Sequence, residues 1–138
     1  MTTTTPYTGT ERYKAPELFI SRDNRRPVAT FEGDIYSFGC VILEVCARQE
    51  KNRVLTLNQL IERICPFRRF STTYDLIGAI MDEKRPALRS ETTDALLDMT
   101  EYLWNLMEAC WGDPPDRPTI SRVVEALEYF RQTIPSSQ

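Results

Sequence analysis

DIYSFGCVILEVC, residues 34–46, is the longest apolar run in the chain. Its polar members Asp34, Ser37 and Glu44 recur at helical spacing and fall on one narrow stripe, while the other directions around the helix are apolar. A helix that is hydrophobic on nearly all sides belongs inside a protein, and this one is too short and too polar to span a bilayer. The run therefore predicts a central buried helix with the other elements packed around it.

Two residues refine the prediction for this helix. Asp34 stands where its side chain can cap the first turn. Gly39 is costly inside a helix, which indicates close approach by another backbone. The periodicity alone fits an ordinary core helix equally well.

Composition limits the classes of function. The chain has 138 residues, of which 41% are hydrophobic and 27% charged, as expected for one soluble globular domain. The net charge of -3 gives no electrostatic case for binding nucleic acid or an anionic membrane. Histidine is absent, which excludes Ser-His triads and His-ligated metal within these residues.

The four cysteines do not suggest a metal site. None of them forms a C-x-x-C pair, so we expect no zinc site and no other metal site. The first residues, MTTTTP, have neither the basic nor the apolar region of a signal peptide. We therefore expect a cytoplasmic protein in a reducing environment.

Several further helices follow from hydrophobic periodicity. One or two turns are expected over 15–20, and longer helices over about 56–64, 73–84, 96–111 and from Thr119 onward. Thr119 is a candidate N-cap. The expected buried faces are Tyr74, Ile77, Ile80 and Met81; then Met99, Tyr102, Leu103, Leu106, Met107 and Cys110; then Ile120, Val123, Val124, Leu127 and Phe130. No segment alternates as a strand does, so periodicity predicts a mainly α domain.

Three stretches of the sequence are more specific than the pattern of a generic helical domain. They are GTERYKAPE at 9–17, the start of the central helix at 34–39, and the region from Leu103 to Thr119 with CW at 110–111 and DPPDRPT at 113–119. In this order they resemble the C-terminal lobe of eukaryotic protein kinases, from the end of the activation segment to the last helix. The resemblance implies the helical C-lobe of the protein kinase-like fold, without the N-lobe or the catalytic loop. Residues 1–138 would then be a partial kinase domain, with mobile ends at 1–8 and 134–138.

The resemblance assigns roles to particular residues. Glu17 and Arg117 match the family's buried ion pair, with two surface charges in unrelated loops as the alternative. Thr10 and Tyr13 match residues that face the substrate, with ordinary loop packing as the alternative. Asp34 matches the aspartate that anchors the central helix to the catalytic loop; without that loop, Asp34 would cap its own helix.

The Thr-rich start occupies the place of the family's activation-loop hydroxyls. Thr4, Thr5, Tyr7 and Thr8 are therefore candidate phosphorylation sites, and a phosphate there could pair with an arginine such as Arg12. An unmodified polar terminus is the equal alternative.

The sequence also lacks the motifs with which kinases bind ATP and catalyse phosphoryl transfer. It contains no Gly-rich loop, no Val-Ala-Ile-Lys lysine, no His-Arg-Asp loop and no Asp-Phe-Gly, which clamp ATP and its magnesium ions in the complete domain. The match covers roughly the second half of a kinase domain, and residues 49–65 form a longer link than usual, with an extra helix at 57–64.

Three readings of function follow. In the first, the chain is an inactive part of a serine/threonine kinase of the tyrosine-kinase-like group. In the second, it is a non-catalytic module that binds a protein substrate or partner. In the third, it is a truncated product without a separate role. The central helix would lack part of its cover in all three, so we expect self-association through apolar surface.

Overall fold

The central helix α1 organises the molecule. A computed structural model describes residues 10–19, 27–47, 66–67, 70, 72–88 and 101–133. Its elements are the 3-10 helices η1 (Thr10–Tyr13), η2 (Pro16–Leu18) and η4 (Pro114–Asp116), and the α-helices α1 (Phe31–Ala47), α3 (Thr73–Met81), α4 (Glu101–Cys110) and α5 (Ile120–Thr133). All regular elements within these ranges are helical, so the mainly α prediction is confirmed.

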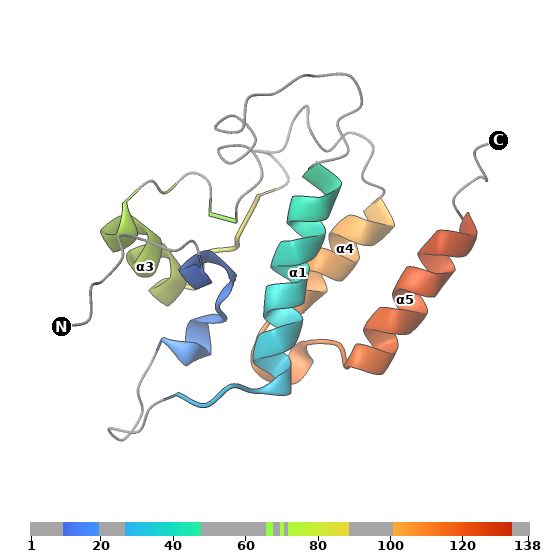
Figure 1. Ribbon diagram of the computed structural model, residues 1–138, viewed down its shortest axis with the longest axis horizontal. Coiled ribbons are helices and arrows are strands. Elements are labelled where there is room, and N and C mark those ends of the chain that lie inside the picture. The colour runs from blue at the N-terminus through green and yellow to red at the C-terminus, as the bar shows by residue number, and fades with distance from the viewer. Residues whose placement is uncertain are drawn as a thin grey trace.

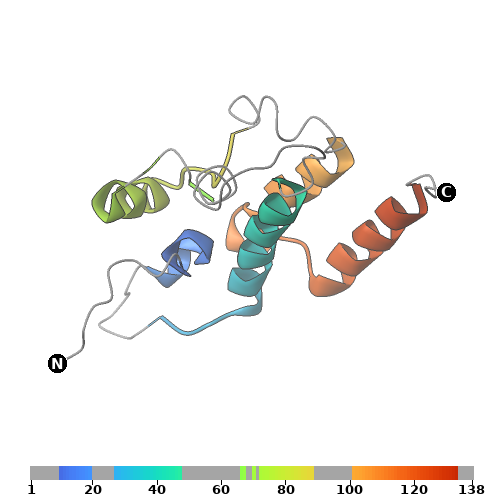
Figure 2. The same ribbon diagram turned by 45° about the horizontal axis from the view of Figure 1, so that its top comes forward.

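The helices form two groups. Helix α1 runs alongside α4, and α5 lies next to this pair; α3 lies apart at the opposite side, with η1 between α3 and α1 (Figure 1). The tilted view keeps the same order (Figure 2). The end of the expected activation segment therefore lies between the central helix and α3.

The core is built where α1 meets α4. Its buried members are Ala15, Tyr36, Cys40, Ile42, Leu43, Trp104, Met107 and Trp111. A Cβ added to Gly39 would lie 2.8 Å from Cys110 Cβ and 2.8 Å from Trp111 Nε1. The close approach expected at Gly39 is therefore present, but the neighbours are side chains rather than a backbone.

The start of α1 differs from the prediction. The helix begins at Phe31, and the Thr30 Oγ1 accepts a hydrogen bond of 3.0 Å from the Gly33 N–H. Thr30 is thus the N-cap, and the expected cap at Asp34 is wrong. Asp34 instead lies in the first turn, where its carboxylate interacts favourably with the helix dipole.

Helix α3 ends earlier than its periodicity indicates. The Lys84 N–H donates to the Ala79 carbonyl and the Glu83 N–H to the Ile80 carbonyl, both at 3.0 Å, while Glu83 adopts a positive φ of 56°. This is a Schellman ending. Because glycine usually occupies the left-handed position and here it is glutamate, the sequence carries no signal for a helix end at Met81.

All three of the expected buried faces are partly wrong. In α3 the buried residues are Leu76, Ala79 and Ile80, which pack with Phe67, whereas Tyr74 is 86% exposed and Met81 51% exposed. In α5 Val123 is buried, as expected, but Ile120 and Val124 are exposed. In α4 Leu103, Met107 and Cys110 are buried and Tyr102 is exposed. Residues 57–64 and Met99 lie outside the described residues.

Candidate functional site

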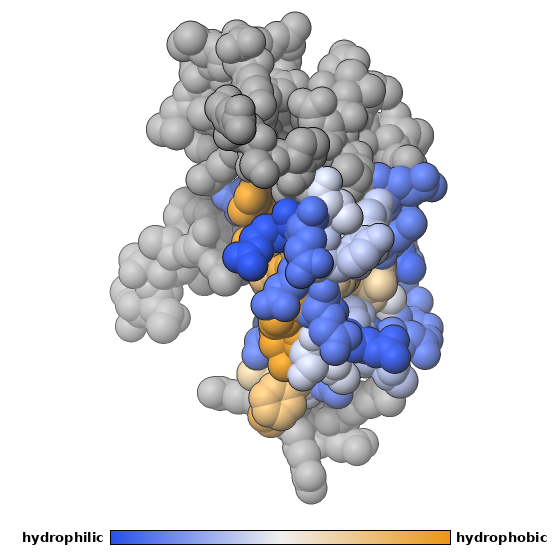
Figure 3. Space-filling model, turned by 90° about the vertical axis from the view of Figure 1, so that its right-hand side faces the viewer, coloured by the Kyte–Doolittle hydropathy of each residue, from blue (hydrophilic) through white to orange (hydrophobic). Residues whose placement is uncertain are grey.

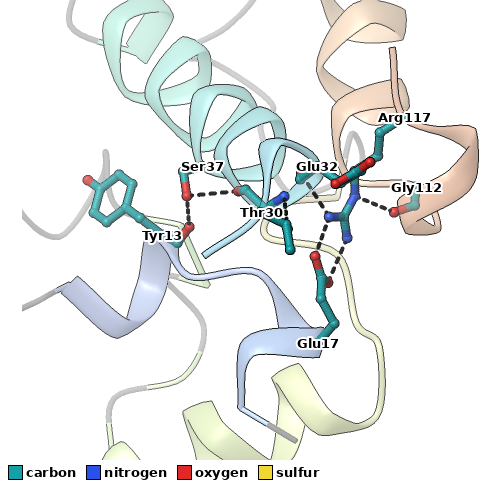
Figure 4. Close-up of polar contacts among 8 residues, drawn as sticks. Tyr13, Glu17, Thr30, Glu32, Ser37, Gly112 and Arg117 are labelled. Atoms are coloured by element: carbon teal, nitrogen blue, oxygen red, sulfur yellow. Dashed lines mark hydrogen bonds and ion pairs between the residues drawn. The ribbon is translucent and has the colours of Figure 1, made fainter. Parts of the chain in front are cut away.

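Glu17 and Arg117 form the ion pair that the kinase resemblance implies. Arg117 Nη1 lies 2.6 Å from Glu17 Oε1 and Nη2 lies 3.0 Å from Oε2, so the contact is bidentate (Figure 4). The Arg117 side chain is 2% exposed and that of Glu17 29% exposed. The pair joins the Ala-Pro-Glu turn, which begins η2, to the loop before α5.

Arg117 makes further contacts that fix its position. Its Nε donates to the Gly112 carbonyl at 2.9 Å and Nη1 donates to the Glu32 carbonyl at 2.9 Å. The guanidinium also stacks over the ring of Tyr36, 5.2 Å from the ring centroid. One side chain therefore holds η2, the start of α1 and the end of α4 together.

The ionisation of the pair follows from these contacts. Burial by itself raises the pKa of Glu17, but the Arg117 hydrogen bonds, a backbone hydrogen bond and the Arg117 charge outweigh it, and the pKa is lowered from its ordinary 4.5. Burial raises the pKa of the Tyr36 phenol, so it stays neutral. The pair is charged at neutral pH.

The polar stripe of α1 holds η1. The Ser37 hydroxyl donates to the Tyr13 carbonyl at 2.7 Å, with the Gly33 carbonyl as a second acceptor at 3.2 Å (Figure 4). Two turns along the same stripe, Glu44 Oε2 accepts a hydrogen bond of 2.8 Å from the Tyr13 hydroxyl. The central helix thus fixes both the backbone and the ring of Tyr13.

Arg12 anchors η1 on the other side. It is buried, and its guanidinium donates to the carbonyls of Pro66 at 3.1 Å, Phe67 at 2.7 Å and Phe70 at 2.8 Å. This ties η1 to the segment that precedes α3. No pattern in the sequence indicated this inward role, and the pairing of Arg12 with a phosphate stays a prediction.

The remaining predicted site residues are placed as follows. Thr10 begins η1. Asp34 is exposed. Thr4, Thr5, Tyr7 and Thr8 lie outside the described residues. The structure therefore brings Glu17 together with Arg117. It also brings Tyr13 together with Ser37 and Glu44, and the sequence did not reveal that Ser37 and Glu44 contact Tyr13.

Possible metal ligands lie apart from one another in the described part of the chain. Within those ranges no three His, Cys, Asp or Glu side chains are grouped so that they could hold a metal ion. Cys40 and Cys110 are buried free thiols. Burial raises the pKa of Cys110 to about 11 and raises that of Cys40 further, so both remain protonated thiols.

In the part of the chain that the structure describes, no helix has the length and apolarity needed to cross a membrane.

Similar proteins carry kinase names. No family model matches the chain. It is 30% identical over 122 residues to the serine/threonine-protein kinase mos of Patiria pectinifera, covering 88% of this chain and 27% of that protein. It is 28% identical over 130 residues to the serine/threonine-protein kinase VIK of Arabidopsis thaliana, covering 94% of this chain and 24% of that protein.

A receptor is also similar. The receptor-type guanylate cyclase gcy-28 of Caenorhabditis elegans is 33% identical over 127 residues, covering 87% of this chain and 9% of that protein. The chain thus spans roughly a tenth to a quarter of the length of these relatives. With the helical fold, they show that the chain belongs to the eukaryotic protein kinase family and corresponds to the C-terminal lobe of its domain.

Proposed function

We propose that the chain supplies the substrate-docking half of a serine/threonine kinase domain of the tyrosine-kinase-like group and that, alone, it transfers no phosphate. The parent reaction would move the γ-phosphoryl of ATP to a protein hydroxyl, in the cytoplasm, with ATP and magnesium held by residues outside this chain. The observation that carries the proposal is the fixation of Tyr13 by Ser37 and Glu44. A rigid wall at this place suits docking of a protein substrate.

The assignment to a group rests on two sequence features. Gly9-Thr10 followed by Arg12-Tyr13 resembles serine/threonine kinases, and Cys110-Trp111 with Arg117-Pro118 is shared by tyrosine kinases and the tyrosine-kinase-like group. The combination favours the tyrosine-kinase-like group. Phosphorylation of Thr4, Thr5, Tyr7 or Thr8 stays a prediction, which mass spectrometry of the protein from its native cell tests.

Calorimetric titration with Mg-ATP tests the proposed lack of catalysis. We expect no saturable heat and no phosphate transfer to a generic Ser/Thr substrate, because the Gly-rich loop, lysine and Asp-Phe-Gly are absent from the sequence. Saturable binding at micromolar ATP would contradict the proposal.

A second candidate function is a non-catalytic module that binds protein. Two relatives are named for other activities, a receptor-type guanylate cyclase and the atrial natriuretic peptide receptor 2 of Anguilla japonica, 31% identical over 80% of this chain. In addition, Val41 and Val45 of α1 are exposed on one side of the helix. Figure 3 shows hydrophobic surface as a narrow strip beside the hydrophilic surface of α5.

Sedimentation tests this candidate. Exposed contiguous apolar surface drives association, so we expect the isolated chain to oligomerise and the double variant Val41→Asp/Val45→Asp to shift it toward monomer. Ile120→Asp, at an exposed site on α5, is the matched control and should leave the oligomer unchanged. A monodisperse wild-type monomer with a high, sharp melting transition would contradict the expectation.

A further inference from the structure

Helix α3 has a small core of its own. Leu76, Ala79 and Ile80 pack with Phe67 in a cluster separate from the core between α1 and α4. Both ribbon views place α3 apart from α1, α4 and α5 (Figures 1 and 2). With nine residues, α3 is too short to be a stable helix in water without tertiary contacts. The helix therefore depends on the contacts that keep this small core in place.

Phe67 enters the small core with a strained backbone. Its φ is 56°, in the left-handed region that glycine adopts readily and bulky residues rarely adopt. Its side chain is fully buried. A residue in this conformation persists only where its surroundings hold it there. The contacts around Phe67 therefore decide whether the core of α3 stays formed.

Arg12 of η1 makes several of these contacts. Its Nη1 donates to the Pro66 and Phe67 carbonyls at 3.1 and 2.7 Å, and its Nη2 donates to the Phe70 carbonyl at 2.8 Å. A planar guanidinium with five N–H donors can bridge carbonyls in this way, whereas a lysine ammonium lacks that fork. The Phe67 N–H in turn donates to the Pro86 carbonyl at 2.6 Å. The strained residue is thus held through both its carbonyl and its N–H.

The segment that carries Arg12 is attached to α1 by other contacts. Its neighbour Tyr13 is fixed by hydrogen bonds to Ser37 and Glu44 of α1. After α3, Ala87 packs against the core between α1 and α4. Both η1 and the chain that follows α3 would therefore stay in place if the contacts of Arg12 were broken.

We propose that Pro66, Phe67, Phe70 and α3 form one unit, the α3 unit, which separates from η1 and loses its helix while the core between α1 and α4 stays folded. The three hydrogen bonds of Arg12 favour the attached form, and the backbone strain at Phe67 favours release. A molecule that binds better to the attached form shifts the equilibrium toward it. Because Arg12 and Tyr13 are neighbours in η1, the state of α3 is thereby connected to the surface proposed for substrate docking.

Hydrogen exchange of the whole chain, followed by mass spectrometry in low concentrations of urea, measures this opening. In the wild type we expect the amides of α3 to exchange roughly tenfold or more faster than the buried amides of α1 and α4, because the α3 unit opens without global unfolding. The exchange of α3 should also depend less on urea, since its opening exposes less surface. Equal rates and equal urea dependence in all three helices would overturn the proposal.

A substitution in the other core tests whether the two openings are separate. Ile42→Val lies in the core between α1 and α4. It should accelerate exchange in α1 and α4 by roughly fivefold and leave α3 unchanged, because it destabilises the attached and released forms equally. Equal acceleration of all three helices would show a single cooperative unit and overturn the proposal.

Variants of Arg12 test its role in holding the unit. Arg12→Lys should accelerate exchange in α3 by roughly tenfold or more, because hydrogen bonds from a charged group are lost. Arg122→Lys, at an exposed site on α5, is the matched control and should change nothing. Unchanged exchange of α3 in Arg12→Lys would overturn the role of Arg12.

Arg12→Ala gives a second measurement that does not require the α3 unit to stay attached. The two tryptophans of the chain, Trp104 and Trp111, are buried in the core between α1 and α4, so their fluorescence reports on that core. We expect this variant to lose helical circular dichroism signal while its tryptophan emission stays that of buried rings. Emission of an unfolded chain, or an unchanged helical signal, would contradict the proposal. Neither nucleotide nor substrate enters these measurements, so they do not depend on the proposed kinase function.

Discussion

Arg117 reaches across 100 residues of sequence to hold Glu17 through two hydrogen bonds of 2.6 and 3.0 Å. Around this pair the Ala-Pro-Glu turn, the start of α1 and the end of α4 converge on one guanidinium. The contact is local in space and distant in the chain, so it fixes tertiary structure rather than any single helix. Its loss should loosen the attachment of the activation-segment end to the helical core.

The ion pair predicts a dependence of stability on pH. The pKa of Glu17 is lowered in the folded state, so its stabilising contribution is complete above the unfolded value near 4.5 and is lost as pH falls through the folded pKa. We expect the urea midpoint to fall on acidification below this range. Glu17→Gln should reduce that slope, and an unchanged slope in this variant would show that Glu17 is not the group responsible.

Replacement by alanine should have opposite effects on stability at Gly39 and Gly78. Gly39→Ala should destabilise by about 1–3 kcal/mol, because the added Cβ would lie 2.8 Å from Cys110 Cβ and Trp111 Nε1. Gly78→Ala should stabilise by up to about 1 kcal/mol, because nothing lies near its added Cβ and alanine favours the helix. Chemical denaturation of both variants checks the pair, and effects of the same sign would contradict the packing described for α1.

The two hydrogen bonds by which α1 fixes Tyr13 predict modest losses in the free energy of unfolding when either is removed. Ser37→Ala and Tyr13→Phe each remove one hydrogen bond, to the Tyr13 carbonyl and to Glu44 respectively. Each should cost about 0.5–1.5 kcal/mol, measured by urea unfolding. Ser121→Ala, at an exposed site on α5, is the control and should stay within about 0.5 kcal/mol of wild type. Variants no less stable than this control would show that the stripe does not hold η1.

Periodicity predicted the helices well but their faces less well. The apolar run from Ile35 to Val45 and the repeat in α4 carry strong helical spacing, and both elements are present. In α3 the spacing suits two faces, one through Tyr74 and Met81 and one through Leu76 and Ile80. Only packing against Phe67 decides between them, and that contact is not local in the sequence.

Side-chain to backbone contacts were the least predictable features. Arg12 binds backbone carbonyls, which every residue has, so nothing in the composition of 66–70 indicates the contact. Thr30 was missed as a cap because Phe31, exposed and outside the apolar repeat, begins the helix. The contact between Glu17 and Arg117 could be predicted, because both residues belong to motifs on which the kinase resemblance rests.

A double-mutant cycle on Glu17 and Arg117 is the most direct test of the kinase C-lobe arrangement. Glu17→Gln and Arg117→Ala should each destabilise, Arg117→Ala by about 3–5 kcal/mol because its removal leaves a partly buried carboxylate without its cation and also removes the hydrogen bonds to the Gly112 and Glu32 carbonyls. Glu17 is partly exposed, so its variant should cost less. The double variant should lose about 1–3 kcal/mol less than the sum. Additive effects, each below about 1 kcal/mol, would contradict the arrangement, because two residues that do not meet have no interaction to lose.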